Sequence, residues 1–385
     1  MPVNAFVMDF AARTLRFGFE SGDETTLPLP TELAVRTNLD RLTVYPRHHE
    51  AVVQLPEGTE AVVELRGGVT VDERLAGRGV AYLDQNKWSV LDRFRRGGSL
   101  PANEAAAAEE LIAMVDERRV VLPASAGNYV ETTPLYGVKR VMLGATVVSL
   151  SRGWQMRNPL HVRFDELRLD LEDRDPVAAE VFAPQAPDVF GPPLSRLLPD
   201  RRLPPPFDTL GRDLSAALSV AEVLIDPARV PDEGDLARVE AWAVDHARFA
   251  KWMGDEGLGP ERARRAVLGK LLVDLTPEVI RLSQITGLDP REIVDRYLGA
   301  DDPIARMPSI SRVRGVLYGR LRNDGQRWEG NDLLDIVNLA CAAGYANVVI
   351  GERQNISYLR QAGTVPPGAS LVTTLVEGVE QLRNV

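Results

Sequence analysis

The sequence predicts a mixed α/β protein: a parallel sheet flanked by helices, preceded by a small β-rich domain and interrupted by a large helical insertion. Three observations support this fold class. Short β-type runs fill the first 78 residues, strands then alternate with helices, and a long helical stretch follows before the alternation returns. The expected domains are residues 1–78, 79–156, 157–325 and 326–385, of which the second and fourth form one discontinuous α/β core.

The first domain is expected to be β-rich because it carries four short apolar runs separated by Gly, Pro, Asp and Asn. These runs occupy residues 5–8, 14–19, 51–53 and 61–65. The segment 72–79 is rich in charged residues and glycine and interrupts the pattern before a new apolar run starts at Val80. We therefore place the domain boundary at residue 78.

The α/β core is expected to begin with a strand at residues 80–83, helices at about 87–96 and 103–117, a strand at 120–122 and one long helix from about 125 to 150. It resumes with a helix at 332–343 and a strand at 347–350. Between these parts the pattern predicts helices at 213–225, 233–253, 260–275, 277–287 and 290–298. A proline-rich segment at 184–206 is expected to be an extended linker.

Composition and charge limit the classes of partner. The net charge of −10 excludes a broadly basic nucleic-acid-binding surface, so any phosphate contact must be local. Only four of the 45 cationic residues are lysines, and arginine can grip phosphate with two hydrogen bonds, although a G+C-rich genome would also favour arginine. The single cysteine, Cys341, lies in an apolar run and is expected in the core. Without a long apolar run or a signal-peptide pattern, we expect a cytoplasmic protein with no membrane contact.

Acidic residues follow the predicted strands of the core. Asp84 comes directly after the apolar run Val80-Ala81-Tyr82-Leu83, at the edge where sites form in parallel sheets. The alternative is that Asp84 or Asn86 only caps the next helix. Glu131 lies in the helix expected after the second strand, where it could face Asp84 or be an ordinary solvated residue.

Three further acids lie at the second part of the core. Asp332 and Asp335 are spaced i, i+3 and share one face of a helix start, where a capping role is the alternative. Glu352 follows the next strand. Several carboxylates meeting at one sheet edge would repel one another unless a cation lay among them, and such oxygen ligands suit Mg²⁺ or Mn²⁺. A bound ion of this kind activates water for hydrolysis of a phosphodiester.

These residues carry a resemblance to a known family. The ordered set Leu83-Asp84-Gln85-Asn86-Lys87-Trp88, Tyr129-Val130-Glu131, Asn331-Asp332 through Asp335 and Tyr345-Ala346-Asn347-Val348-Val349 resembles a PIN-domain nuclease, in particular the divergent PIN-like proteins of bacteria. The resemblance covers about residues 80–155 and 328–365. It implies a parallel sheet flanked by helices, acids in the order Asp, Glu, Asp, Asp around Mg²⁺ or Mn²⁺, and cleavage of RNA.

The resemblance assigns roles to individual residues. Asp84 would be the first acid, Glu131 the second and Asp332 the third, because its spacing to Gly344 fits the family better than that of Asp335, a close rival. The fourth acid would fall near Glu352, where this chain departs from the usual aspartate, which puts a second metal position in doubt. The family's small polar residue after the first acid corresponds here to Gln85, with Asn86 next, and either could bind phosphate or a metal-bound water.

Basic and aromatic residues near these acids are candidates for holding substrate. They are Arg152, at the end of the helix expected to include Glu131, Arg353, beside Glu352, and the group Arg312, Arg314, Arg320 and Arg322, which precedes the third acid. The alternative is that these arginines are solvated or paired with acids. Trp88 and Trp154 could stack on bases, although a tryptophan near strand ends is usually part of the core.

The leading hypothesis is a metal-dependent endonuclease that cuts RNA, acting as a toxin or in RNA turnover or defence. A second hypothesis is a catalytically silent PIN-like scaffold that binds RNA or protein partners. A third is a hydrolase of small phosphoesters. The sequence leaves open the choice between RNA and DNA and whether the chain forms a homo-oligomer.

Overall fold

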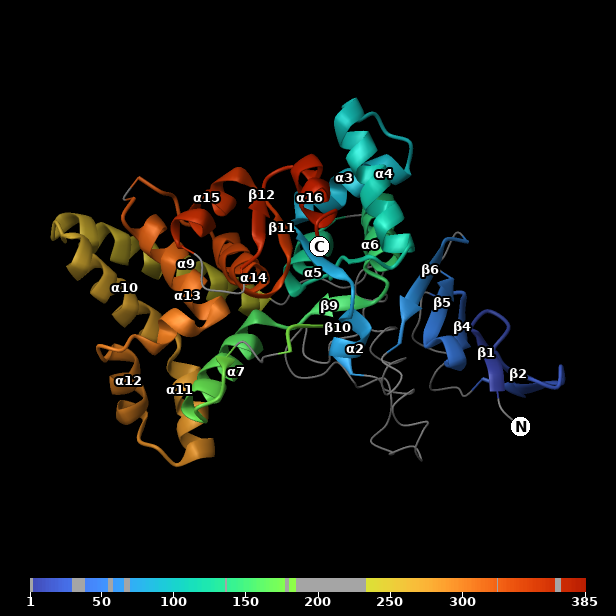
Figure 1. Cartoon of the computed structure of the whole chain (residues 1–385), viewed down its shortest axis with the longest axis horizontal. Coiled ribbons are helices and arrows are strands. Elements are labelled where there is room, and N and C mark those ends of the chain that lie inside the picture. The colour runs from blue at the N-terminus through green and yellow to red at the C-terminus, as the bar shows by residue number, and fades with distance from the viewer. Residues whose placement is uncertain are drawn as a thin grey trace. The chain divides into compact units, whose positions relative to one another are not determined.

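The structure is a computed structural model that describes residues 3–29, 39–54, 58–65, 70–135, 137–176, 180–184, 233–323, 325–363 and 368–385. Figure 1 shows its helices and strands. The chain divides into two compact units, Met1–Asn158 with Phe182–Val230 and Pro159–Val181 with Pro231–Val385. Within the described ranges, no helix is both long and apolar enough to cross a membrane.

The first unit contains a six-stranded antiparallel sheet in the order β3-β2-β1-β4-β5-β6. Its strands are β1 (Val3–Asp9), β2 (Thr14–Phe19), β3 (Glu24–Pro28), β4 (Arg41–Tyr45), β5 (Glu50–Gln54) and β6 (Glu60–Glu64). Alternation along the strands buries Leu42, Val44, Ala51 and Val53 on one face. The four predicted runs lie in β1, β2, β5 and β6, apart from Leu65, which directly follows β6, and neither β3 nor β4 was predicted. β3 was missed because it is an edge strand exposed along its whole length, so no apolar pattern marks it.

A short helix, α2 (Val71–Leu75), lies where the sequence indicated only a break. The Thr70 hydroxyl accepts a hydrogen bond from the Glu73 backbone N–H, and the Glu73 carboxylate accepts one from the Thr70 N–H. This reciprocal capping box supplies partners for donors that a helix start would otherwise leave unsatisfied. The polar residues that suggested a turn therefore form a helical turn.

Parallel strands and intervening helices follow, as predicted. β7 (Gly79–Leu83) pairs in parallel with β8 (Val120–Val121), and α3 (Gln85–Arg95) and α4 (Ala102–Asp116) connect them. All five residues of β7 are buried, as expected for a strand covered on both faces. A parallel pair of strands connected by two helices confirms the mixed α/β class.

The prediction of one helix from residue 125 to 150 is wrong. The structure has two helices, α5 (Ala126–Thr132) and α6 (Val138–Ser151), separated by a segment that contains Pro134. Gly137 adopts a positive φ of 57° directly before α6, a conformation that other residues rarely adopt. After α6 the chain forms β9 (Trp154–Met156), which pairs antiparallel with β10 (Phe182–Pro184).

The second unit is mainly helical. Its first helices are α7 (Pro159–Leu171), α9 (Glu233–Asp255), α10 (Pro260–Asp274), α11 (Thr276–Thr286) and α12 (Pro290–Leu298). The four helices predicted between residues 233 and 298 are confirmed. The helix predicted at 213–225 and the prolines at 192–193 and 204–206 lie outside the described residues.

The remainder of the second unit carries its strands. It contains α13 (Pro308–Leu321), α14 (Gly330–Tyr345), β11 (Val348–Ile350), α15 (Arg353–Gln361), β12 (Ser370–Val372) and α16 (Leu375–Leu382), and β11 pairs in parallel with β12. Helix α14 packs against α13, and a Cβ added to Gly344 would lie 2.9 Å from the backbone of Pro308. Cys341 lies buried in α14, as predicted.

Candidate metal centre

Asp84 is the N-cap residue of α3, at the carboxyl end of β7. Its backbone is extended (φ −67°, ψ 157°), and its Oδ1 accepts a hydrogen bond from the Gln85 backbone N–H over 2.9 Å. The side chain is half-buried. Asp84 therefore caps the helix, one of the two roles considered from the sequence, and its carboxylate also lies where a ligand at the sheet edge is expected.

Glu131 lies in α5, and its side chain is exposed. The helix starts at Ser125, whose hydroxyl accepts a hydrogen bond from the Asn128 N–H while the Asn128 side chain accepts one from the Ser125 N–H. This capping box sets the start of α5, so that Glu131 comes in its second turn.

A buried chain of hydrogen bonds ties the start of α3 to α5. Gln85 Nε2 donates to Thr132 Oγ1 over 2.8 Å, and Asn128 Nδ2 donates to Gln85 Oε1 over 3.3 Å. Asn128 Nδ2 also lies 3.4 Å from the Leu83 carbonyl oxygen at the end of β7. Both ends of the buried Gln85 amide are thus bonded within the protein, which does not support its predicted role in binding substrate. These bonds hold in place the segments that carry Asp84 and Glu131.

Asp332 and Asp335 differ in their surroundings although both lie on α14. The Asp332 carboxylate pairs with the guanidinium of Arg320, at 2.9 Å for Nη1–Oδ1 and 2.7 Å for Nη2–Oδ2. Its Oδ2 also accepts a hydrogen bond from the Glu329 N–H over 2.7 Å. Asp332 thus caps α14 and compensates an arginine that is only 2% exposed. Asp335, one turn further along, is half-buried.

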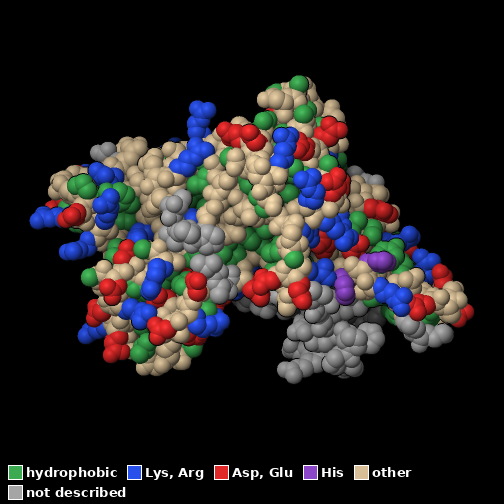
Figure 2. All heavy atoms as spheres, viewed as in Figure 1, with side chains coloured by type: hydrophobic (Ala, Val, Ile, Leu, Met, Phe, Trp, Pro, Cys, Tyr) green, Lys and Arg blue, Asp and Glu red, His purple; other side chains and the backbone are tan. Residues whose placement is uncertain are grey.

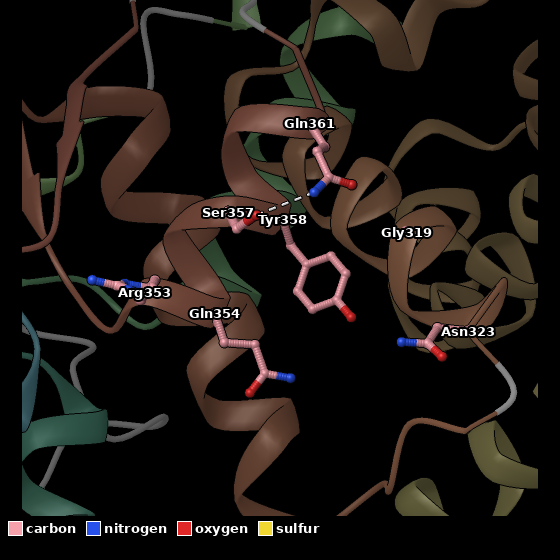
Figure 3. Close-up of a pocket in the computed structure, with 7 residues that line it drawn as sticks. All are labelled: Gly319, Asn323, Arg353, Gln354, Ser357, Tyr358 and Gln361. Atoms are coloured by element: carbon pink, nitrogen blue, oxygen red, sulfur yellow. Dashed lines mark hydrogen bonds between the residues drawn. The ribbon is translucent and has the colours of Figure 1, made fainter.

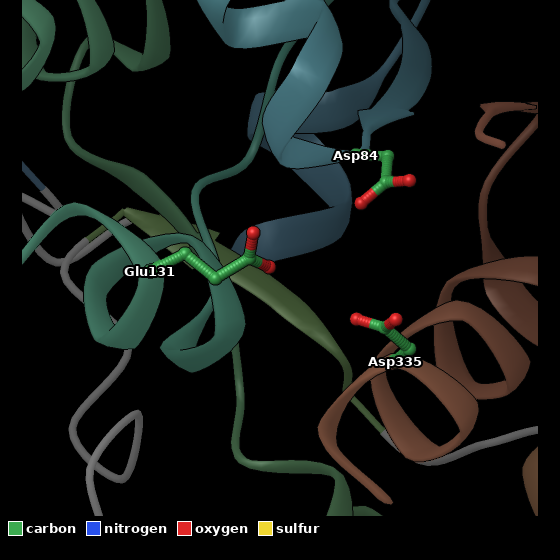
Figure 4. Close-up of side chains that lie close together, drawn as sticks. All are labelled: Asp84, Glu131 and Asp335. Carbon is green, nitrogen blue, oxygen red and sulfur yellow. The ribbon is translucent and has the colours of Figure 1, made fainter. Parts of the chain in front are cut away.

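Asp84, Glu131 and Asp335 form a carboxylate cluster. One oxygen from each side chain lies within 4.8 Å of the others, and Figure 4 shows the three carboxylates directed toward a common space. The structure therefore reverses the ranking of the two aspartates: Asp335 belongs to the cluster, whereas Asp332 is bonded to Arg320. Spacing along the helix could not show this, because Arg320 comes from a different helix.

The cluster has the donor chemistry of a hard divalent cation. Oxygens on opposite sides of a bound Mg²⁺ lie about 4.2 Å apart, and around Ca²⁺ about 5 Å apart. The three oxygens of the cluster all lie within 4.8 Å of one another, which is compatible with their sharing one ion.

Glu352, Arg353 and Asn86, which were also predicted to belong to the site, lie outside the carboxylate cluster. Glu352 is the N-cap residue of α15, has an exposed side chain and is not a member of the cluster found among the described residues. Its predicted metal-binding role is not supported by this geometry. Arg353 is the first residue of α15 and lines a pocket in the second unit. Asn86 is half-buried in the first turn of α3, and its role in binding phosphate or a metal-bound water stays a prediction.

Arg152 forms ion pairs within the first unit. It pairs with Glu50 at 2.9 Å and with Glu64 at 3.1 Å, and so joins the end of α6 to the six-stranded sheet. Burial by itself would raise the pKa of Glu64, but the bonds from Arg78 and Trp154 and the charge of Arg152 hold that pKa below its usual value. The guanidinium of Arg152 is therefore already paired with carboxylates, which does not support its predicted role in binding substrate.

The two tryptophans considered for base stacking are core residues. Trp88 and Trp154 are both 0% exposed, and Trp154 Nε1 donates to Glu64 over 3.0 Å. A base has no access to either ring, so the alternative interpretation as core residues is confirmed.

Most of the candidate substrate-binding arginines that precede α14 in the sequence bond to other groups of the protein. Arg312 is buried and donates to the Pro308 carbonyl oxygen over 2.6 Å, while Arg314 pairs with Asp302 at 2.5 Å. Arg322 is exposed, and its guanidinium lies 5.3 Å from the ring centre of Tyr318. Figure 2 shows basic and acidic side chains interspersed on the visible face, in agreement with the absence of a broad basic surface there.

Sequence reasoning missed Asn128 and Thr132, which join α5 to Gln85, and most of the residues that line the pocket beside Arg353. The Ser125-Gly127-Asn128 region carries a capping pattern that could have indicated the start of α5. No short motif marks the pocket, because its residues come from two helices.

Comparisons of the chain with models of known protein families, with characterised proteins and with solved structures gave no match. The PIN-like resemblance therefore rests on the motifs of the sequence alone.

Proposed function

We propose that this protein is a PIN-like, divalent-cation-dependent nuclease that hydrolyses phosphodiester bonds in RNA. The observation that carries the proposal is the cluster of Asp84, Glu131 and Asp335, each with an oxygen within 4.8 Å of the others. Carboxylate oxygens are the ligands that hard divalent cations such as Mg²⁺ and Mn²⁺ prefer in proteins, and three of them this close together can serve one ion. All three were also among the acids indicated by the family resemblance.

The surrounding residues support a preorganised ligand set. The Gln85 N–H orients the Asp84 carboxylate, and the bonds from Gln85 to Thr132 and Asn128 hold the helix that carries Glu131. Asp335 is held by α14, whose start is fixed by Asp332. A Mg²⁺ or Mn²⁺ ion bound by these carboxylates would supply an activated water and charge stabilisation at the phosphate.

The proposal is tested by measuring Mn²⁺ binding by calorimetry and cleavage of a labelled single-stranded RNA. We expect Asp84→Asn, Glu131→Gln and Asp335→Asn to lower both by more than about 100-fold, because even residues that only orient a metal ligand typically cost about 10- to 100-fold. Asp116→Asn is the matched control, since Asp116 is an exposed acid at the end of α4. Unchanged cleavage by Asp84→Asn would contradict the mechanism.

Asp332→Asn tests the distinction between the two aspartates of α14. It leaves the buried guanidinium of Arg320 without its charged partner, so we expect the unfolding free energy to fall by about 3 kcal/mol. Mn²⁺ affinity of the folded protein should stay close to wild type. The opposite pattern is expected for Asp335→Asn, which removes a ligand and relieves repulsion within the cluster.

A catalytically silent scaffold is the second candidate. Two observations favour it: Glu352 lies outside the cluster, and Arg152 is engaged with Glu50 and Glu64 instead of facing a substrate. A scaffold would show Mn²⁺ binding or none, but no cation-dependent turnover of RNA, single-stranded DNA or a small phosphoester. Turnover of the small ester alone would instead indicate a phosphatase.

A further inference from the structure

A pocket of about 600 Å³ lies between α13 and α15 in the second unit. The two helices approach closely at Gly315 and Gly319: a Cβ added to Gly319 would lie 2.9 Å from Cδ1 of Tyr358. Beyond this contact the helices leave an open space lined by Gly319, Asn323, Arg353, Gln354, Ser357, Tyr358 and Gln361 (Figure 3).

Every lining residue except Gly319 has a polar group in its side chain, and none is acidic, although the chain as a whole carries a net charge of −10. Three carboxamides, those of Asn323, Gln354 and Gln361, offer both donors and acceptors. Arg353 supplies a permanent positive charge, and Tyr358 an aromatic ring that stands in the middle of the space in Figure 3. The pocket thus offers carboxamides that can pair with base edges, a guanidinium that can bind a phosphate and an aromatic ring that can stack on a base.

Two of the lining side chains are held in position from the loop after α13. Gln326 Oε1 accepts hydrogen bonds from Gln354 Nε2 over 3.1 Å and from the Tyr358 hydroxyl over 3.2 Å. Gln361 Nε2 likewise donates to Ser357 Oγ over 3.1 Å. Side chains that are already ordered lose less conformational entropy when a ligand binds.

We propose that this pocket binds a short stretch of single-stranded nucleic acid, an inference that rests on the proposed nuclease function and assigns a substrate subsite to it. Asparagine and glutamine amides pair with base edges, tyrosine stacks on bases, and arginine binds phosphate. The volume lies within the range of about 300–1,000 Å³ typical of ligand sites, and its open form lets a strand continue into solvent.

The position of the pocket within its unit fits this role. Both α13 and α15 pack against α14, which carries Asp335. Arg353 directly follows Glu352, at the end of β11 where sites form in parallel sheets. The pocket and one acid of the cluster are therefore built on the same group of helices.

The test is fluorescence anisotropy of a labelled oligoadenylate, in ribose and deoxyribose forms, bound by the full chain in EDTA so that cleavage does not occur. We expect wild type to bind, and Asn323→Ala and Gln354→Ala each to weaken binding by about 2- to 10-fold. Arg353→Ala should weaken it similarly and also reduce the slope of log affinity against log salt by about 0.7, the value for one phosphate contact on a single strand.

The matched controls are Gln284→Ala and Arg291→Ala, which change an exposed amide and an exposed arginine on α11 and α12. Both should bind like wild type. Absence of oligonucleotide binding by the wild-type chain, or unchanged affinity and salt slope in Arg353→Ala, would overturn the pocket assignment. A preference between the two sugar forms identifies the strand type.

The failure of this inference is distinguishable from failure of the proposed function. Asp84→Asn should abolish Mn²⁺-dependent cleavage yet bind the oligonucleotide in EDTA as wild type does. Cation-dependent cleavage with pocket variants that bind normally would reject only the pocket. Pocket-dependent binding without any cleavage would reject only the nuclease.

Discussion

Gln85 occupies a buried position from which it bonds to two residues of α5. Replacing it with leucine leaves Thr132 and Asn128 without these partners, so we expect Gln85→Leu to lower the unfolding free energy by about 1–3 kcal/mol. Because Glu131 lies beside Thr132 on the same helix, we also expect Mn²⁺ affinity to fall by about 10- to 100-fold. Urea unfolding and calorimetric titration measure the two effects.

The control for this prediction is Gln284→Leu, a change at an exposed glutamine that should alter neither quantity. Thr132→Val removes the other end of the same bond, and the double variant should be non-additive by about 0.5–3 kcal/mol. A loss of stability with unchanged Mn²⁺ affinity would show that Gln85 has a structural role only.

Glu166 is a fully buried acid that joins three elements of the second unit. Its Oε1 accepts hydrogen bonds from the Ser309 N–H and the Tyr345 hydroxyl, both over 2.6 Å, and its Oε2 accepts one from the Ile310 N–H over 3.0 Å. The carboxylate thereby satisfies donors at the start of α13. Burial raises the pKa of Glu166 to about 7, although these hydrogen bonds act in the opposite direction.

This raised pKa predicts a dependence of stability on pH. The folded protein holds the Glu166 proton more tightly than the unfolded chain does, so the associated stability is fully present below the ordinary pKa of 4.5 and is lost as the pH rises through about 7. The decrease should not exceed about 1.4 kcal/mol per pH unit. Urea unfolding between about pH 5 and pH 8 should show this decrease in wild type and not in Glu166→Gln. An identical slope in both proteins would exclude the assignment.

At the scale of elements, the contact between α13 and α15 depends on glycine. A Cβ on Gly315 would lie 2.2 Å from the Cβ of Ala362, which is too close for either atom. We therefore expect Gly315→Ala to lower the unfolding free energy by about 1–3 kcal/mol, in spite of the higher helix propensity of alanine.

Gly269 in α10 supplies the matched control, because a Cβ there meets nothing within 4 Å. Gly269→Ala should raise the unfolding free energy by about 0.5–1 kcal/mol. Thermal or urea unfolding should therefore show that the unfolding free energies of the two variants change in opposite directions. A stabilised Gly315→Ala variant would mean that the helices can separate at no cost.

Elements were predictable where a local pattern was strong. The strands β1, β2, β5 and β6 follow alternation of apolar residues, and the helices from 233 to 298 follow helical periodicity and prolines at their starts. The break between α5 and α6 was missed, although Pro134 and Gly137 both lie in it, because the flanking residues are apolar enough to continue a helical pattern. Strands as short as β9 carry too few residues for any period.

At the scale of the whole molecule, the proposed cation would bind the folded chain only, because Asp84 and Asp335 are distant in sequence. Mn²⁺ at about 100 times its dissociation constant should therefore raise the unfolding free energy by about 2.7 kcal/mol. We expect a rise in the thermal midpoint that is retained in Asp116→Asn and lost in Asp84→Asn and Asp335→Asn. Scanning calorimetry with and without Mn²⁺ measures it, and an equal rise in all four proteins would indicate binding elsewhere.

The acids of the candidate site were identifiable from the sequence because each follows an apolar strand or lies in the first two turns of a helix of the α/β core. Asp84, Glu131 and Asp335 were all among them. The roles of nearby residues were not identifiable from the sequence. Local patterns also predicted that Asp332, Gln85 and Arg152 belong to the site. Each of these three instead bonds to a residue distant in sequence.

Local patterns in the chain were thus sufficient for the α/β class, the β-rich start, the helical middle and a short list of acids, because alternation, helical period and capping act between residues a few positions apart. The partner of each polar side chain depended on the folded arrangement. Arg320 forms an ion pair with Asp332, whereas Asp335 belongs to the carboxylate cluster. Glu64 forms an ion pair with Arg152, and Thr132 accepts a hydrogen bond from Gln85. Burial makes an unpaired charge or amide costly, so these pairings are set by what lies nearest in space rather than by order in the sequence.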